Sequence, residues 1–282
     1  CDDLAQEGID ILKQEFEVDV KTKLREDELL EIIPKYDAIV VRSATKVTQK
    51  IIEKSNLKVI GRAGVGVDNI DVEFATKKGV LVVNAPEGNT IAASEHTIAL
   101  LMAAARNIPA GVMSLKNKNW DRKKFMGVEL RGKTLGVVGL GRIGKDVAKK
   151  AMGLGMNVIA YDPYVIKEHV ENIHVQVVDL EAVIKEADFI TFHVPVTKST
   201  YHMINKERIN MMKDGVIIIN CARGGIIDET ALYEGLVSGK IAACALDVFE
   251  HEPPLDSPLI DLPNVIATPH LGASTAEAQI NV

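Results

Sequence analysis

Residues 133–145 read Lys-Thr-Leu-Gly-Val-Val-Gly-Leu-Gly-Arg-Ile-Gly-Lys. The apolar run Leu135–Val138 predicts a buried parallel strand, and apolar residues at helical intervals behind it predict a helix. Gly139, Gly141 and Gly144 follow the strand with G-x-G-x-x-G spacing. In such a turn the first glycine permits a tight bend, the second lets a pyrophosphate approach, and the third lets the helix pack on the strand. The stretch therefore predicts a dinucleotide site at a helix start, although glycine-rich turns also arise for structural reasons alone.

The next predicted strand supports this site and narrows the choice of cofactor. Residues 157–162 follow the predicted helix and end in Asp162. A carboxylate at this position accepts hydrogen bonds from the adenosine ribose hydroxyls and repels a 2′-phosphate. We therefore expect NAD rather than NADP.

The composition excludes several classes of function. The chain has 282 residues, 47% hydrophobic and 26% charged, which suits two globular domains. Its net charge of −6 and scattered basic residues argue against a nucleic-acid partner. No apolar run is long enough to cross a membrane, so we expect no membrane partner. No histidine or cysteine spacing is typical of metal ligands, so we expect no bound metal. The three cysteines show no paired framework, which favours a cytoplasmic location. The chain opens at Cys1 and stops abruptly, so we expect a fragment truncated at both ends and lacking a first strand.

The first part of the chain alternates predicted strands and helices. After a helical stripe at residues 4–16 and a short alternating strand at Val18 and Val20, we predict strands at 37–43, 57–61 and 80–84, and helices at 28–33, 48–55 and 72–78. This alternation predicts a small open parallel α/β domain. Ligands bind such sheets at the loops that follow the strands, which here hold residues 42–46 and 62–68.

A long apolar helix is predicted at 94–106. Its Ala, Leu and Met content favours a role in packing or subunit contact, and we expect a homodimer or homotetramer. Residues 120–127, before the nucleotide strand, place the only Trp beside three cations. We interpret these cations as part of a solvated loop.

The second half continues the α/β pattern, with predicted strands at 188–195, 216–222, 241–247 and 265–270 and helices at 180–187 and 228–236. Arg223, Glu252 and His270 follow strand ends. Interconversion of a 2-hydroxy acid and a 2-oxo acid needs three such groups. Arg holds a carboxylate and polarises a carbonyl, His exchanges the hydroxyl proton, and a carboxylate orients the imidazole.

Each of these residues has a structural alternative when it is considered alone. Arg223 could be an ordinary surface residue, His270 could cap a turn, and Glu252 could lie in a rigid exposed loop. Their joint placement past the strand ends of a nucleotide domain favours catalysis.

Three motifs carry a family resemblance. They are Asn-Cys-Ala-Arg-Gly-Gly-Ile-Ile-Asp at 220–228, Ala-Leu-Asp-Val-Phe-Glu-His-Glu-Pro-Pro at 245–254 and Pro-His-Leu-Gly-Ala-Ser-Thr at 269–275. They resemble the signatures of the D-isomer-specific 2-hydroxyacid dehydrogenases, and the resemblance covers essentially the whole chain. It implies catalytic roles for Arg223, Glu252 and His270.

The resemblance also implies an α/β fold of two doubly wound parallel-sheet domains. A Rossmann-type NAD domain, residues 88–269, would be inserted into a smaller flavodoxin-like substrate domain, residues 1–87 and 270–282, with catalysis in the cleft between them. The residues expected to contact NAD are Gly139, Gly141, Arg142, Ile143, Gly144, Asp162, Pro163, His193, Val194, Pro195, Cys221, Ala222, Asp247, Gly272 and Ala273.

Further motifs at 41–48, 61–69 and 120–127 resemble family members that act on a phosphorylated substrate. They imply oxidation of D-3-phosphoglycerate to 3-phosphohydroxypyruvate, the first step of the phosphorylated route to serine. Such a substrate carries two anions, so its site needs cations beyond Arg223. We expect the substrate to be bound by Arg42, Ser43, Arg62, Gly64, Val65 and Gly66, with Lys46 nearby and Val65 acting through its backbone. Alternatively, Arg42 and Arg62 stabilise their own loops.

Two other functions stay open. A glyoxylate or hydroxypyruvate reductase is expected if those cations do not face the substrate. An NAD-sensing, corepressor-like binding protein would keep the fold and expose an apolar groove on the substrate domain. An enzyme needs Arg223, Glu252 and His270 together, and because the sequence retains all three, we favour the enzyme.

Overall fold

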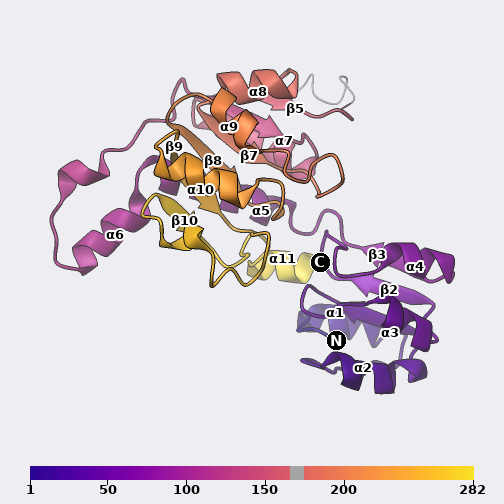
Figure 1. Ribbon diagram of the computed structural model, residues 1–282. Coiled ribbons are helices and arrows are strands. Elements are labelled where there is room, and N and C mark those ends of the chain that lie inside the picture. The colour runs from indigo at the N-terminus through magenta and orange to yellow at the C-terminus, as the bar shows by residue number, and fades with distance from the viewer. Residues whose placement is uncertain (166–174) are drawn as a thin grey trace. The chain divides into compact units, whose positions relative to one another are not determined.

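Each of the two units of the chain is built on its own parallel sheet (Figure 1). A computed structural model describes residues 1–165 and 175–282. The smaller unit holds residues 1–89 and 273–282, and the larger unit holds residues 90–272. The boundaries expected from the sequence differ by a few residues, since 88–89 belong to the smaller unit and 270–272 to the larger one. His270 therefore lies in the same unit as Arg223 and Glu252.

The sheet of the smaller unit has the order β1-β2-β3, with β1 at Ala38–Val41, β2 at Val59–Arg62 and β3 at Leu81–Asn84. One face packs on helices α2 (Glu26–Ile32), η1 (Ile33–Lys35), α3 (Gln49–Lys54) and α4 (Val72–Lys77). Alternating side chains such as Ile39 and Val41 point into that core, as the period of a strand requires. The predicted α/β alternation is confirmed in this unit.

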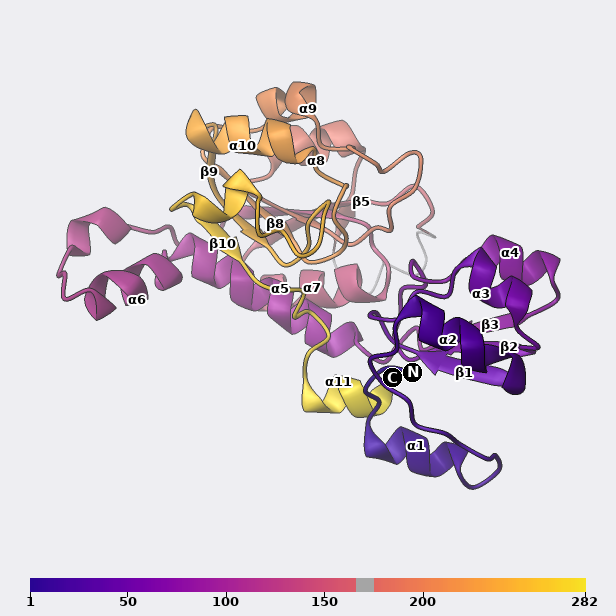
Figure 2. The same cartoon turned by 60° about the horizontal axis from the view of Figure 1, so that its bottom comes forward.

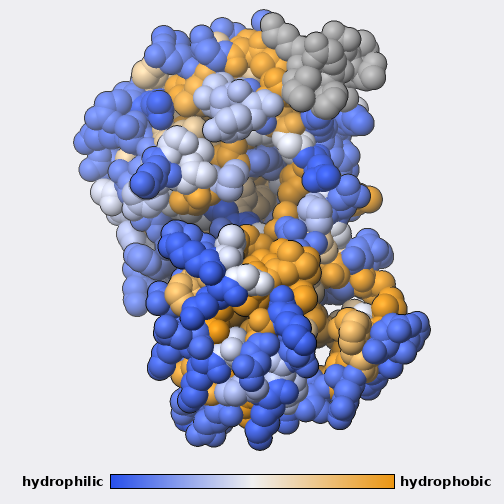
Figure 3. All heavy atoms as spheres, turned by 90° about the vertical axis from the view of Figure 1, so that its right-hand side faces the viewer, coloured by the Kyte–Doolittle hydropathy of each residue, from blue (hydrophilic) through white to orange (hydrophobic). Residues whose placement is uncertain are grey.

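The opposite face of this sheet is more open. Helices α1 (Gln6–Leu12) and α11 (Ala276–Asn281) contribute, with Val40 and Val83, to the lining of a cavity of about 360 Å³. Leu81 and Val83 remain exposed, and apolar surface is visible among hydrophilic side chains in Figure 3.

The short strand predicted at Val18 and Val20 was wrong. Residues 17–22 have no regular structure, and Val20 is exposed. An alternating pattern forms a strand only where a neighbouring strand supplies backbone hydrogen bonds, and no strand among the described residues pairs with this segment.

The larger unit has a seven-stranded sheet of order β10-β9-β8-β7-β4-β5-β6. Its strands are β4 (Thr134–Val138), β5 (Asn157–Tyr161), β6 (Gln176–Val177), β7 (Phe189–Phe192), β8 (Val216–Asn220), β9 (Ile241–Leu246) and β10 (Val265–Ala267). All neighbouring strands are parallel. The chain winds in opposite directions from β4, so the carboxyl ends of β4 and β7 form the switch point at which such sheets bind ligands.

Helices cover both faces of this sheet (Figure 2). Helices α5 (Thr90–Ala105) and α7 (Arg142–Gly153) pack on one face, and α8 (Leu180–Glu186), α9 (Lys206–Met211) and α10 (Glu229–Val237) pack on the other. Every residue of β7 and β8 is buried, which explains their continuous apolar runs. The predicted doubly wound architecture is confirmed in this unit.

An arm extends from the larger unit after α5 (Figure 1). It contains α6 (Ile108–Lys116), which buries none of its residues, and the 3₁₀ helix η2 (Arg122–Phe125). A second 3₁₀ helix, η5 (Pro258–Asp261), precedes β10. The sequence patterns did not reveal α6. The left-handed Asn107, with φ of 51°, ends α5 and redirects the chain into it.

The described residues include no single helix with the length and apolarity needed to cross a membrane. Only α5 and α6 together pass that test, with a bend of 63° between them. Within the same residues, no three His, Cys, Asp or Glu side chains are grouped as metal ligands.

Candidate active site

The glycine turn at the switch point is shaped by close backbone packing. Gly139 has φ of +97°, and a Cβ there would lie 2.5 Å from the His193 carbonyl oxygen. A Cβ on Gly144 would lie 2.0 Å from the Gly139 carbonyl oxygen. In contrast, nothing lies within 4 Å of a Cβ built on Gly141. The first and third glycines are therefore required by packing, and the second leaves the open approach that a pyrophosphate needs.

Asp162 is held against this turn at the end of β5. Its Oδ2 accepts a hydrogen bond from the Leu140 backbone N–H at 2.8 Å, and its Oδ1 accepts one from the Tyr164 N–H at 2.8 Å. A carboxylate has about four lone-pair sites, so it retains acceptor capacity for ribose hydroxyls. The glycine turn and Asp162 together fit an NAD molecule, with Arg142 and Ile143 at the start of α7 and Pro163 exposed beside Asp162.

Residues at the end of β7 line the same switch point. The His193 backbone N–H donates to the Val138 carbonyl at 2.7 Å, and Val194 and Pro195 follow it. Burial lowers the pKa of His193 to about 3, so its imidazole is neutral and pairs with the Thr191 hydroxyl at 3.1 Å. This side chain therefore contributes no charge near the expected cofactor.

His270 and Glu252 form the central pair of the site. Nδ1 of His270 lies 2.9 Å from Oε2 of Glu252, and the other carboxylate oxygen accepts the Phe249 backbone N–H at 3.2 Å. The hydrogen bond that His270 donates to Glu252 raises the pKa of His270 above its ordinary value, despite partial burial and the opposing charge of Arg223. Burial disfavours the charged form of Glu252, but His270 and the Phe249 amide outweigh it and lower the pKa of that carboxyl. The pair therefore stabilises the imidazolium that forms when His270 takes up a proton.

Arg223 is presented by a tight loop after β8. The buried Asn220 holds this loop, since its Oδ1 accepts the Ala222 N–H at 3.0 Å and its Nδ2 donates to the Arg223 carbonyl at 2.8 Å. Nη1 of Arg223 donates to the Ala222 carbonyl at 2.7 Å. The loop also packs tightly on the Glu252 loop, because a Cβ on Gly224 would lie 1.8 Å from the Phe249 carbonyl oxygen. Arg223, Glu252 and His270 are thus brought together within the larger unit.

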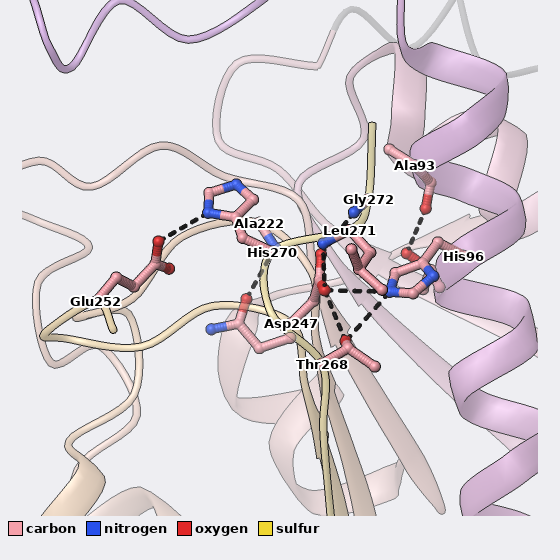
Figure 4. A network of polar contacts seen from close by, with 11 residues as sticks. Ala93, His96, Ala222, Asp247, Glu252, Thr268, His270, Leu271 and Gly272 are labelled. Carbon is pink, nitrogen blue, oxygen red and sulfur yellow. Dashed lines mark hydrogen bonds and ion pairs between the residues drawn. The ribbon is translucent and has the colours of Figure 1, made fainter. Parts of the chain in front are cut away.

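Asp247 fixes the turn that carries His270 (Figure 4). Its Oδ1 accepts the Thr268 hydroxyl at 2.6 Å and the Leu271 N–H at 2.7 Å, and its Oδ2 accepts the Gly272 N–H at 2.7 Å. Asp247 is 1% exposed. Asp247 stays a predicted NAD contact, and both of its carboxylate oxygens also accept hydrogen bonds from the protein. The structure thus gives this carboxylate a role in holding the catalytic turn.

His96 supports Asp247 from helix α5. Its Nε2 lies 3.2 Å from Oδ1 of Asp247 and 3.3 Å from the Thr268 hydroxyl. Sequence reasoning gave no role to His96, Thr268 or Asn220. His96 lies inside a predicted helix, Thr268 lies inside a predicted strand, and Asn220 is quoted only as the first residue of the motif at 220–228. The thiol of the nearby Cys221 is unreactive, since burial raises its pKa to about 12 and keeps it protonated.

The expected substrate-binding residues lie in the smaller unit, at the carboxyl ends of β1 and β2. The Arg42 backbone N–H donates to Asp2 at 2.6 Å, and its Nη1 donates to the Asp3 carbonyl at 3.3 Å. Arg62 folds over its own loop, where Nη1 donates to the Ala63 carbonyl at 3.0 Å. Both arginines border the cavity of about 360 Å³.

Other predicted residues of the smaller unit occupy the same loops or the C-terminal segment. Ser43 is exposed, Val65 accepts a hydrogen bond from Asn84 through its carbonyl, and Gly64 and Gly66 flank it. Ala273 also belongs to this unit, whereas its neighbour Gly272 belongs to the larger one.

Comparisons with known proteins show which family the chain resembles. Residues 98–272 match the NAD binding domain of the D-isomer specific 2-hydroxyacid dehydrogenases. The chain is 60% identical over 280 residues to a D-3-phosphoglycerate dehydrogenase of Methanocaldococcus jannaschii, covering 99% of this chain and 53% of that protein. It is 52% identical over 286 residues to a hydroxypyruvate reductase of Thermotoga maritima, covering 100% of this chain and 92% of that protein.

A solved structure of D-lactate dehydrogenase from Aquifex aeolicus, complexed with NAD and lactic acid, is similar with a TM-score of 0.85. It is 33% identical in sequence, and the match covers 98% of this chain and 90% of that one. The chain spans about half the length of the D-3-phosphoglycerate dehydrogenases that it matches.

Proposed function

Because the chain belongs to the D-isomer specific 2-hydroxyacid dehydrogenases, we propose that it catalyses the NAD-dependent oxidation of D-3-phosphoglycerate to 3-phosphohydroxypyruvate. The observation that carries this proposal is the His270–Glu252 pair at 2.9 Å, in the same unit as Arg223 and the glycine turn. Relatives with the name D-3-phosphoglycerate dehydrogenase support the choice of substrate.

The chemistry follows from the three side chains. Arg223 binds the substrate carboxylate and polarises the C2 oxygen. Because Nδ1 of His270 is paired with Glu252, Nε2 is the nitrogen that accepts the hydroxyl proton. Glu252 stabilises the resulting imidazolium and fixes the ring. NAD, when bound, supplies the acceptor for the hydride that leaves C2.

We assign selection of the phosphate to Arg42 and Arg62. A cation paired with a phosphate in a partly dry site contributes about 1.5–3 kcal/mol, or roughly ten- to a hundredfold in specificity. Arg42→Ala should therefore lower kcat/KM for 3-phosphoglycerate by that factor and leave glycerate nearly unaffected. Lys58→Ala is the matched control, since Lys58 precedes β2 at its opposite end and pairs with Asp37 on the surface.

A hydroxypyruvate reductase is the second candidate, supported by the relative from Thermotoga maritima, of which the chain covers 92%. A turnover screen of the full-length protein with 3-phosphoglycerate, glycerate, lactate and 2-hydroxyglutarate separates the two. Preference of the wild type for glycerate, or equal losses for both substrates in Arg42→Ala, would favour the reductase.

We also propose that the protein forms a homodimer through the arm. Ile108, Val112, Met113, Leu115 and Trp120 are all exposed there, and two copies of such an arm would bury each other's apolar side chains. Leu115→Glu should shift the mass measured by light scattering to that of a monomer. Val237→Glu, at an exposed position on α10 and outside the arm, should leave the mass unchanged.

A further inference from the structure

A second cluster of titratable side chains lies beside the loops of Arg223 and Glu252, and no role has been given to it so far. It consists of Glu229, Glu250 and His202. The Glu250 backbone N–H donates to Oε1 of Glu229 at 2.7 Å, and the Glu229 N–H donates to Oε1 of Glu250 at 3.2 Å. His202 Nε2 lies 2.9 Å from the same Oε1 of Glu250. The two glutamates thus bind each other's backbones reciprocally, and His202 completes the network.

The cluster joins the segments that carry two of the catalytic side chains. Glu250 is two positions before Glu252, on the loop whose Phe249 amide holds the Glu252 carboxylate. Glu229 is the first residue of α10, at the end of the loop that begins with Arg223. The cluster therefore ties the loop of Glu252 to the loop of Arg223.

His202 extends the tie to a third segment. Its backbone has a φ of 48°, and its N–H donates to the Gly225 carbonyl at 2.7 Å. Its ring stacks on Tyr201, with centroids 4.0 Å apart. The imidazole is therefore held by the Tyr201 ring and by Oε1 of Glu250, on a backbone that is itself anchored to Gly225.

Holding two carboxylates together has a cost. Burial and the neighbouring Glu250 charge raise the pKa of the Glu229 carboxyl. A hydrogen bond from a backbone N–H partly compensates each carboxylate for this unfavourable environment, and Glu250 also pairs with His202. A strained arrangement of this kind persists where the surrounding structure imposes it, and such places are often functional.

We propose that Glu250 is a positioning residue. Glu229 and His202 hold it, and it keeps Glu252, and therefore His270, in the correct position relative to Arg223. The kinetic consequences of this inference rest on the proposed function. Displacing a reacting group by about 1 Å lowers the rate on the order of a hundredfold. Loosening the Glu252 loop should thus lower kcat and leave the binding of NAD largely unchanged.

The test compares Glu250→Ala with Glu250→Gln. Both network bonds of the Glu250 side chain end on Oε1, which the amide oxygen of Gln replaces, whereas Ala removes both. Glu250→Ala should lower kcat roughly ten- to a hundredfold with little change in KM for NAD. Glu250→Gln should restore most of the rate, since it keeps the geometry without the charge. Glu234→Gln, which changes an exposed glutamate of α10 paired with Lys206, is the matched control.

A measurement independent of activity is the NMR titration of His270. Glu252 raises the pKa of His270 through their hydrogen bond, so Glu250→Ala should lower that pKa and Glu250→Gln should not. His202→Asn should lower the pKa of His270 by a smaller amount, because it removes only one of the two bonds to Oε1 of Glu250. Asn is chosen because it tolerates the left-handed backbone at this position. Because His202→Asn keeps both glutamates, it still tests the proposal if Glu250→Ala does not fold.

Two outcomes would overturn the proposal. One is a wild-type kcat and His270 titration in Glu250→Ala, and the other is an equal change in Glu250→Gln, which would indicate loss of charge alone. If the wild type oxidised no 2-hydroxy acid, the proposed function would fail instead. The NMR titration would still decide whether Glu250 positions the pair.

Discussion

Replacing Asp247 with Asn should loosen the turn that carries His270. The carboxylate accepts three hydrogen bonds from this turn, at 2.6 Å from Thr268, 2.7 Å from Leu271 and 2.7 Å from Gly272. Asn can supply one acceptor oxygen, and its NH₂ group would then face a backbone N–H. The variant is nearly isosteric, so the change tests hydrogen bonding and charge rather than packing.

The magnitude follows from the contacts that are lost. A buried N–H without a partner costs about 1–3 kcal/mol, and replacing charge-assisted hydrogen bonds by neutral ones costs about 1–2 kcal/mol more. The expected loss is therefore about 2–5 kcal/mol, within the 5–15 kcal/mol typical of a folded domain. We expect a folded protein with a displaced His270 and a kcat lower on the order of a hundredfold.

The loss of stability should depend on pH in a defined direction. Burial opposes ionisation of Asp247, but hydrogen bonds from His96, Thr268 and Leu271 outweigh it and lower its pKa in the folded state. A free Asp titrates near pH 3.9. The stability due to the carboxylate is therefore fully present above about pH 4 and is lost as the pH falls through the lower folded-state pKa.

Urea unfolding followed by circular dichroism at several pH values measures this effect. The difference between wild type and Asp247→Asn should be constant from neutral pH down to about pH 5 and should shrink below about pH 4. Asp214→Asn serves as the control, since the Asp214 side chain is 90% exposed and its pair with Lys240 should contribute little. Identical urea midpoints at neutral pH, or a difference that is undiminished at pH 3, would refute the role assigned to Asp247.

Three further predictions concern the site. Glu252→Gln should move the acid limb of the pH–rate profile to lower pH, because the pKa of His270 is raised mainly by that carboxylate, and an unchanged profile would contradict the pairing. Asp162→Ser should weaken NAD binding and narrow its advantage over NADP, measured by titration with each cofactor; a wild type that prefers NADP would contradict the role of Asp162. Gly144→Ala should lower the urea midpoint markedly because its Cβ would lie 2.0 Å from a carbonyl oxygen, whereas Gly141→Ala should keep the midpoint and weaken NAD binding. Equal midpoints for the two alanine variants would contradict this contrast.

The sequence alone determined the glycine turn and most of the strands and helices, but it missed α6 and wrongly predicted a strand at Val18 and Val20. Those features are local, since a buried strand needs only a run of apolar residues and a tight turn needs only its glycines. It also placed Arg223, Glu252 and His270 after strand ends, and parallel strands bring such ends to one edge of a sheet.

The tertiary structure decided what holds those side chains in place. His96 and Thr268 are 172 positions apart, and Glu229 and Glu250 are 21 apart, so no local pattern links either pair. It also placed Asp247 inside the protein, where its oxygens bind the turn of His270. A buried carboxylate is stable only where donors from distant segments converge on it, and that convergence exists only once the chain has folded.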